Sequence, residues 1–360
     1  MYRILAINPG STSTKFAVYF DEECVLKKSI KHSFDELLDY KNVVDQFDFR
    51  KGLIIDAIVE NGIDVDKIKY IIGRGGITYP LESGVYRVNN LMLKHVREGI
   101  LGEHASNLGP MLADYIALQI PGARAFIADP VVTDEMEEVA RIAGHPKFER
   151  RSVFHALNQK ATARMHAMKV GRKYEDLNLI IVHLGGGISV GAHQKGKVID
   201  VNNALNGEGA FSPERSGTLP VGQLIEICFS GKYTEDQIKS MAVGEGGFVS
   251  YLGTNDAREV EEMVKSGNKK AAFIQEALFY QVSKMIGEMA VVLEGKADAI
   301  LLTGGLAFNK SVEGYIRSKA GFIAPIYSYP GEDELEALAM NALLAAKGEV
   351  EIKEYNKGSL

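Results

Sequence analysis

The sequence has few cysteines, no long apolar run and no excess of positive charge. Two cysteines, Cys24 and Cys228, cannot form a disulfide framework in a chain of 360 residues, which favours a reducing compartment, the cytoplasm. No apolar run approaches the ~20 residues that span a bilayer, and Met1-Tyr2-Arg3 leads directly into a predicted strand, so we expect neither a membrane anchor nor a signal peptide. The net charge of −6 provides no basic footprint for nucleic acid.

Two common nucleotide-binding motifs are also missing. No G-x-G-x-x-G occurs in the sequence. The segment GAHQKGKV at 191–198 approaches G-x-x-x-x-G-K-[ST], but it ends in Val198, which has no hydroxyl group for a metal ion. It also precedes a predicted strand, whereas that motif opens a helix. A nucleotide would therefore have to bind at turns between strands.

What the sequence does contain is a repeated pattern of strands and polar or glycine-rich turns. ILAINPGSTSTKFAVYF (4–20) and LNLIIVHLGGGISVGAHQKGKVIDV (177–201) each alternate strand, turn and strand, and LLTGG (301–305) adds a strand that ends in glycines. A chain of this length is too long for one typical core, so two domains are expected. The repetition predicts two similar halves that hold one nucleotide.

Each half is predicted to have the order strand, strand, strand, helix, strand, helix, strand. This order indicates α/β domains with mixed sheets flanked by helices. The second half carries extra helices, which follow a long irregular stretch at 202–222, and loops of that length are usually functional or disordered. A helix predicted at 334–346 can return to the first half. We assign residues 1–150 and 337–360 to an N-terminal domain, and 151–336 to a C-terminal domain with a helical insertion.

Polar and charged side chains occupy the predicted strand ends. The first turn combines Asn8 and Lys15 with a run of hydroxyls, a set that can cradle phosphate oxygens. Phosphoryl transfer requires cationic clamps, a carboxylate near Mg²⁺ and a donor directed at the moving phosphoryl group. The candidates for these roles are Arg74 and Arg215 as clamps, Asp129 and Glu334 as carboxylates, and His155 as the donor.

Each of these side chains also has an ordinary structural interpretation. Lys15 can be a solvated strand residue, and Arg74 can pair with a surface carboxylate. Asp129 can bond the turn before Pro130, and Glu334 can be a favourable acid in the first turn of a helix. Only the combination of all of them points to phosphoryl transfer.

Four motifs, NPGSTSTK, HLGGGIS, SPERSGTLP and TGGLAFN, together resemble the butyrate kinases of the acetokinase family. That family belongs to the superfamily of acetate and sugar kinases, actin and heat-shock ATPases, and the resemblance covers essentially the whole chain. It implies two ribonuclease-H-like domains with a nucleotide cleft between them, and ATP and Mg²⁺ as cofactors. It further implies the reaction ATP + butanoate → ADP + butanoyl phosphate by direct in-line transfer, and self-association into a homo-oligomer.

The resemblance also implies residue roles. The nucleotide-binding residues would be Asn8, Ser11, Thr12 and Lys15 in the first phosphate turn, His183, Gly185, Gly186 and Gly187 in the second, and Gly304, Gly305 and Asn309 in an adenosine-side loop. The catalytic set would be Arg74, Asp129, His155 and Arg215, with Arg74 and His104 facing the carboxylate substrate, and with Asp129 and Glu334 nearest the metal. Glu332 is an alternative to Glu334.

Other functions remain compatible with the residues themselves. A carboxylate acceptor with a pKa of ~4.3 is ionised at neutral pH and needs no general base, whereas a sugar kinase would need one, and Asp129 would be the candidate. A nucleotide-gated binding module is a further alternative, although no additional substrate-binding domain is visible. The acid's chain length stays open, because one methylene in an apolar pocket contributes only ~1–3 kcal/mol.

Overall fold

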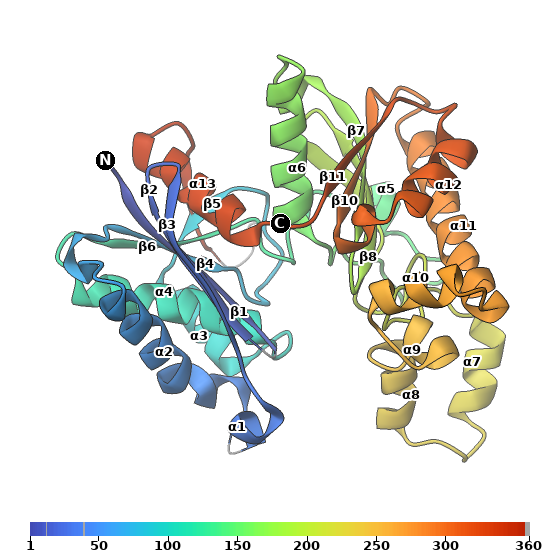
Figure 1. The fold of residues 1–360 in the computed structure, drawn as a ribbon, viewed down its shortest axis with the longest axis horizontal. Helices are drawn as coiled ribbons and strands as arrows, with labels where there is room; N and C mark the ends of the chain where they lie inside the picture. Colours follow the sequence, from blue (N-terminus) through green and yellow to red (C-terminus); the bar gives the residue numbers. More distant parts are fainter. Residues whose placement is uncertain (12, 39, 357–360) are drawn as a thin grey trace. The chain divides into compact units, whose positions relative to one another are not determined.

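A computed structural model describes residues 1–11, 13–38 and 40–356, and the chain divides into two compact units (Figure 1). Unit 1 comprises Met1–Thr133 and Asp333–Leu360, and unit 2 comprises Asp134–Glu332. The predicted boundaries, after residues 150 and 336, differ from this division. The contacts of Glu135 explain why unit 2 begins at Asp134 and not after residue 150. The Glu135 carboxylate accepts hydrogen bonds from Lys160 Nζ at 2.6 Å and from the Val198 amide at 2.9 Å, and both partners belong to unit 2.

Unit 1 contains a mixed sheet with the strand order β12-β5-β6-β4-β1-β2-β3. Its strands are β1 (Arg3–Gly10), β2 (Ser13–Phe20), β3 (Glu23–Lys31), β4 (Tyr70–Arg74), β5 (Val85–Arg87), β6 (Arg124–Ala128) and β12 (Ile352–Glu354). Strands β1, β2 and β3 form an antiparallel meander, and β4 and β6 run parallel to β1. The short β12 pairs with β5 at the opposite edge of the sheet.

Helices cover both faces of this sheet (Figure 1). The helices of unit 1 are α1 (Phe34–Leu38), α2 (Phe47–Glu60), α3 (Asn90–Glu98), α4 (Leu108–Gln119) and α13 (Glu334–Lys347), with short 3₁₀ turns η1 (Val43–Gln46), η2 (Val65–Lys67) and η3 (Ala105–Asn107). Leu5 and Ile7 of β1 join one core with Ile54 and Ile58 of α2. Because side chains alternate along a strand, Asn8 projects to the opposite face, which α13 covers.

Unit 2 repeats the central strand order of unit 1. Its sheet has the order β11-β10-β7-β8-β9, built from β7 (Asn178–Leu184), β8 (Ile188–Gln194), β9 (Lys197–Val201), β10 (Ala299–Gly304) and β11 (Ile326–Pro330). As in unit 1, an antiparallel meander is followed by two strands parallel to its first strand. The repeated topology confirms the predicted fold of two α/β halves with mixed sheets.

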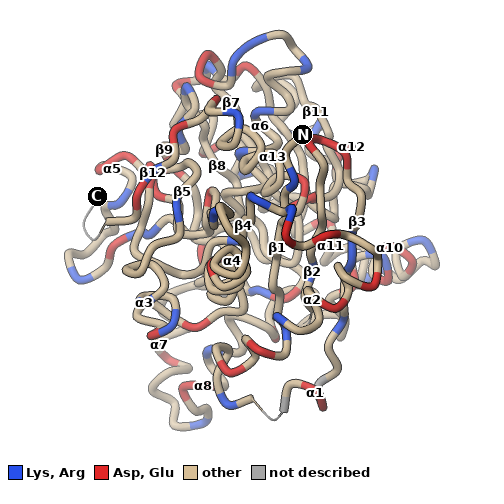
Figure 2. The backbone as a smooth tube through the Cα atoms, turned by 90° about the vertical axis from the view of Figure 1, so that its left-hand side faces the viewer, with Lys and Arg blue, Asp and Glu red and all other residues tan. Residues whose placement is uncertain are grey.

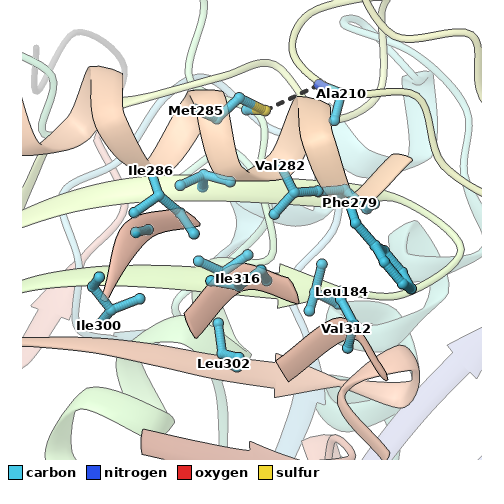
Figure 3. Close-up of a cluster of buried hydrophobic side chains, with 14 of the residues drawn as sticks. Leu184, Ala210, Phe279, Val282, Met285, Ile286, Ile300, Leu302, Val312 and Ile316 are labelled. Carbon is cyan, nitrogen blue, oxygen red and sulfur yellow. Dashed lines mark hydrogen bonds between the residues drawn. The ribbon is translucent and has the colours of Figure 1, made fainter. Parts of the chain in front are cut away.

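Helices also flank the sheet of unit 2. They are α5 (Glu138–Arg141), α6 (Ala156–Lys169), α7 (Val221–Cys228), α8 (Glu235–Ala242), α9 (Gly247–Leu252), α10 (Ala257–Lys265), α11 (Lys269–Val292) and α12 (Lys310–Ala320), with 3₁₀ turns η4 (Tyr174–Asp176) and η5 (Gly305–Phe308). Figure 3 shows Val282 and Ile286 of α11 in one buried cluster with Ile300 and Leu302 of β10. The other face of the sheet packs against α6, where Leu179 and other buried residues form a separate cluster.

Acidic and basic residues are interspersed along the chain, without a dominant basic tract (Figure 2). Among the described residues, no helix has both the length and the apolar character needed to cross a bilayer.

Candidate active site

Three predicted site residues of unit 1 lie at the ends of adjacent parallel strands. Asn8 is near the end of β1, Arg74 ends β4, and Asp129 directly follows β6, in which Ala128 pairs with Arg74. The carboxyl ends of neighbouring parallel strands form one edge of the sheet, which is where ligands bind in α/β folds. The structure therefore places these three residues along one edge.

Arg74 is the centre of a small polar cluster at this edge. Its Nη1 donates to Asn8 Oδ1 at 3.3 Å and to Glu334 Oε2 at 3.2 Å, and Asn8 Nδ2 donates to the same carboxylate oxygen. The Arg74 and Glu334 side chains are only 21% and 14% exposed. Nε and Nη2 of Arg74 form no hydrogen bond with any other described residue, so one edge of the guanidinium group remains available to a ligand.

Two glycines bring the end of β4 against the start of α4. A Cβ on Gly73 would lie 2.2 Å from the Gly109 carbonyl oxygen, and a Cβ on Gly109 would lie 2.1 Å from the Arg74 carbonyl oxygen. Any larger residue at either position would overlap backbone atoms. This close packing sets the position of the Arg74 backbone, and with it the polar cluster.

Asp129 and His104 have well-defined local partners. Asp129 is 1% exposed and has a φ of 39°, and its Oδ1 accepts from Ser83 Oγ at 2.6 Å and from the Gly84 amide at 2.9 Å. His104 Nδ1 accepts the amide hydrogen of Ser106 at 3.2 Å, so the neutral ring carries its proton on Nε2. The hydrogen bonds of Arg74 go to Asn8 and Glu334, and not to these two residues.

The turn that was predicted to bind phosphate first along the chain connects β1 and β2. Lys15 pairs directly with Asn8 across the two strands, so both side chains lie on the same face, and Lys15 is exposed. Ser11 is exposed in the turn itself. Thr12, also predicted to contact the nucleotide, lies outside the described residues.

A buried arginine below this turn was not anticipated from the sequence. Arg50 of α2 is fully buried, and its Nη1 donates to the carbonyl oxygens of Gly10 (2.8 Å) and Ser13 (2.9 Å). Burial lowers the pKa of Arg50 to about 10, at which the group is still cationic at neutral pH. From α2, Arg50 thus binds two backbone carbonyl groups of the turn through its guanidinium group. The available signal was spacing, since Arg50 is four residues before Ile54 on the buried stripe of α2.

In unit 2, two histidines stack beside the glycine turn that follows β7. The ring centroids of His155 and His183 are 3.7 Å apart, and their planes are inclined by 9°. His183 Nδ1 lies 2.7 Å from Asn158 Oδ1, and His183 Nε2 lies 3.4 Å from Glu332 Oε2. The structure therefore brings together the two histidines that the sequence placed at separate strand and helix ends.

Gly187 makes room for Arg215 next to this pair. A Cβ on Gly187 would lie 2.0 Å from Arg215 Nη1 and 3.3 Å from His155 Cε1. Arg215 Nη1 donates to the Ala204 carbonyl at 2.7 Å, whereas its buried Nε has no hydrogen-bond partner among the described residues. Burial lowers the pKa of Arg215, and the neighbouring Glu214 opposes this shift.

The long loop that was predicted at 202–222 holds Arg215 in place. No helix or strand is present between the end of β9 and the start of α7 at Val221. Ser212 Oγ donates to the Gly186 carbonyl and accepts the amide hydrogen of Arg215 at 3.2 Å. These bonds tie the loop to the glycine turn of residues 185–187.

The predicted adenosine-side loop adjoins the same glycine turn. Gly304 has a φ of 87° and lies so close to β7 that a Cβ would be 2.4 Å from the Leu184 carbonyl oxygen. Gly305 opens η5 directly after it. Asn309 has a structural role as the N-cap of α12, because its Oδ1 accepts the amide hydrogen of Ser311 at 2.8 Å.

The two candidate metal-proximal acids belong to different units. Glu332 is the last residue of unit 2 and lies beside His183, whereas Glu334 begins α13 in unit 1 and pairs with Arg74. Within the described part of the chain, no group of three or more His, Cys, Asp or Glu side chains could hold a metal ion on its own. Mg²⁺ typically binds through substrate phosphates with one or two carboxylates, and Asp129 and Glu334 are the two carboxylates that were predicted for this role.

Comparisons with known proteins show which proteins this chain is similar to. The model of the Acetokinase family matches residues 145–318. The chain is 52% identical over 354 residues to butyrate kinase 2 of Clostridium acetobutylicum, which covers 98% of this chain and 99% of the relative.

Two solved structures share the fold at low sequence identity. Acetate kinase of Porphyromonas gingivalis matches with a TM-score of 0.78 and 17% identity, covering 96% of this chain and 100% of that chain. Propionate kinase of Francisella tularensis matches with a TM-score of 0.73 and 20% identity, covering 94% and 98%. These structures support the two-domain ribonuclease-H-like fold.

Proposed function

Because the chain belongs to the acetokinase family, we propose that it transfers the γ-phosphoryl group of ATP to butanoate, producing ADP and butanoyl phosphate. The observation that carries this proposal is the 52% identity to a butyrate kinase across 98% of the chain. Cys24 and Cys228 are both exposed free thiols, so a reducing cytoplasm is the compartment we propose.

In this reaction the attacking group is already activated. A short-chain carboxylate is ionised at neutral pH, so no residue needs to remove a proton. An oxygen of butanoate forms the new bond to the γ-phosphorus, while the bond from that phosphorus to the bridging β,γ-oxygen breaks. Arg74 would bind the carboxylate through its Nε and Nη2 groups, a bidentate geometry that suits guanidinium. His104 would add its Nε2–H as a second donor.

The residues of unit 2 would bind the nucleotide and balance charge on the moving phosphoryl group. The glycine turn at 185–187 offers backbone amides to phosphate oxygens. Arg215 and His155 flank this turn, and they would donate hydrogen bonds to the equatorial oxygens, whose charge must be stabilised during transfer. Within the described parts of the chain, the buried Nε of Arg215 has no hydrogen-bond partner.

Mg²⁺ would be held mainly by the ATP phosphates, with Asp129 and Glu334 as the carboxylates nearest to it. When bound, it would screen the negative charge of the phosphates. Asp129 is thereby assigned to the metal or its waters, and not to proton abstraction.

An acyl-phosphate trap tests the reaction. With butanoate, ATP, Mg²⁺ and hydroxylamine, the protein should accumulate butanoyl hydroxamate, because hydroxylamine captures the acyl phosphate. Excess EDTA should abolish the product if Mg²⁺ is required, and omission of butanoate provides the blank. Rates on a series of straight and branched acids would define the substrate range. ATP turnover that ignores every short acid, with no hydroxamate, would contradict the proposal.

We also propose that the protein forms a homo-oligomer through α7 and the segment around it. None of the residues of α7 is buried, and Val221, Ile225 and Phe229 are 71%, 53% and 87% exposed. A short apolar helix gains little stability without packing, and contiguous exposed apolar side chains commonly mark an interface. Sedimentation velocity should detect an oligomer that Phe229→Glu weakens. A monomeric wild-type protein at micromolar concentration would refute this proposal.

A further inference from the structure

A row of buried polar residues leads away from His155 on the α6 side of the unit 2 sheet. Ser189, Gly191 and His193 alternate along β8, so they share one face. Their neighbours Val190 and Ala192 belong to the apolar core on the α11 side. Ser189, His193 and Gln159 of α6 are all 0% exposed. An uninterrupted apolar contact would be expected here, so the polar residues need an explanation.

These side chains form one continuous series of hydrogen bonds. Tyr174 Oη lies 2.6 Å from His193 Nδ1, and His193 Nε2 lies 2.9 Å from Gln159 Oε1. Gln159 Nε2 lies 2.8 Å from Ser189 Oγ, which in turn lies 2.9 Å from His155 Nδ1. We refer to Tyr174, His193, Gln159 and Ser189 as the relay.

The direction of the relay follows from Gln159. Its Nε2 also lies 3.2 Å from the backbone carbonyl of Ser189, which can only accept a hydrogen bond. The amide nitrogen must therefore face Ser189, and the amide oxygen must face His193. Because that oxygen is an acceptor, His193 donates from Nε2.

His193 has one ring hydrogen available for this bond. Burial, followed by the charge of Lys160, lowers the pKa of His193 well below its usual value, so the ring is neutral. With its hydrogen on Nε2, Nδ1 is an acceptor, and the Tyr174 hydroxyl donates to it. Tyr174 thus donates to His193, and His193 donates to Gln159.

The hydroxyl of Ser189 completes the series. It accepts a hydrogen from Gln159 Nε2, and among the residues that the structure describes its other side-chain partner is His155 Nδ1, to which it can donate. From this geometry we propose that Gln159 and Ser189 are positioning residues that hold His155 as the neutral tautomer with its proton on Nε2. His155 is then presented as a hydrogen-bond donor, and not as a base.

Gly191 supports this arrangement sterically. A Cβ at this position would lie 2.7 Å from Gln159 Oε1 and 3.2 Å from His193 Nε2, the two atoms of one relay bond. Its backbone conformation does not require glycine, since its φ is not in the left-handed region. Space for the relay is therefore the reason that β8 has a glycine here.

His155 also stacks on His183, with ring centroids 3.7 Å apart and ring planes inclined by 9°. This contact and the hydrogen bond from Ser189 together hold the His155 ring in place. A neutral N–H donor suits the equatorial oxygens of a phosphoryl group whose acceptor needs no base, and this part of the inference rests on the proposed function.

The tautomer can be measured without an activity assay. In protein labelled with ¹⁵N-histidine, long-range ¹H–¹⁵N spectra distinguish a protonated from an unprotonated ring nitrogen. His155 is one of eight histidines, and its signals are assigned as those that disappear in His155→Asn. We expect a protonated Nε2 and an unprotonated Nδ1 in the wild type at neutral pH. A proton on Nδ1 would overturn the proposal, whatever reaction the protein catalyses.

Ser189→Ala tests the consequence for turnover. Loss of an oriented donor typically costs about 10²–10³ in kcat, and loss of its orientation alone should cost less, about tenfold. KM for ATP should change less than kcat, and the His155 signals should shift toward a tautomer mixture. Ser189→Thr, which retains the hydroxyl, should restore the wild-type spectrum.

Ser328→Ala is the matched control, because the buried Ser328 hydroxyl of β11 has no partner among the described residues. It should leave both kcat and the His155 spectrum unchanged. A wild-type spectrum and kcat in Ser189→Ala would refute the positioning role. If the tautomer is as expected but no hydroxamate forms from any acid, the relay stands and the proposed function fails.

Discussion

Replacing Arg74 by alanine should lower kcat by about 10³-fold or more, the range associated with an arginine that stabilises phosphoryl transfer. The expected change in ATP affinity is much smaller, because Arg74 is assigned to the carboxylate and the moving phosphoryl group. In the structure its guanidinium group is held by Asn8 and Glu334, with Nε and Nη2 left for a ligand. Steady-state rates of hydroxamate formation and ATP binding by calorimetry would measure the two effects separately.

Two further substitutions serve as controls for this result. Arg74→Lys keeps the charge but loses the planar pair of donors, so it should recover only a small part of the activity. Arg87→Ala removes an arginine from another strand end of the same unit, where an exposed 3.7 Å contact with Glu354 contributes little. It should leave kcat nearly unchanged. An Arg74→Ala enzyme with wild-type turnover would remove Arg74 from the reaction.

Gly109→Ala should destabilise unit 1 by about 3 kcal/mol, the upper part of the range for overpacked sites. The added methyl group would meet the Arg74 carbonyl oxygen at 2.1 Å, and backbone atoms cannot rotate away as a side chain can. Since this contact places the end of β4, the fraction that remains folded should also lose activity. The chain has no tryptophan, so urea unfolding is best followed by circular dichroism.

Gly52→Ala, in the same unit, should have the opposite effect on stability. Gly52 lies inside α2, and a Cβ there would meet nothing within 4 Å. Alanine should therefore stabilise the helix by about 0.5–1 kcal/mol relative to glycine. If both variants unfold at the same urea concentration as the wild type, the close contact between β4 and α4 is not the constraint we infer.

The strand pattern and its repetition were readable in the sequence because they depend on local chemistry. Alternating apolar residues, glycine turns and short polar connections define the meander around Asn8 and again around His183, and both meanders are present. The helix predicted at 334–346 forms as α13 and belongs to unit 1. The predicted boundaries after residues 150 and 336 differ from those of the compact units. The boundaries of the compact units depend on tertiary contacts, such as that of Glu135 with Lys160.

The residue types of the candidate site and their positions at strand ends could be predicted from the sequence. Which of these residues contact one another could not. From the sequence, Glu334 was the predicted metal-proximal acid and Glu332 the alternative, and the structure pairs Glu334 with Arg74 and Glu332 with His183. Asn309 matched a nucleotide loop, and it also caps a helix. Arg50 and Gln159 were overlooked because each lies on a helix, far in sequence from the turn or histidine it supports.

The sequence by itself determined the fold class, the duplication and the family, since these depend on short-range periodicity and on motifs read in order. Only the tertiary structure decided which acid meets which cation, why Gly109 and Gly191 must be glycine, and which nitrogen of His155 carries the proton. Those properties arise from contacts between segments that are distant along the chain, where steric exclusion and hydrogen-bond direction act only after folding.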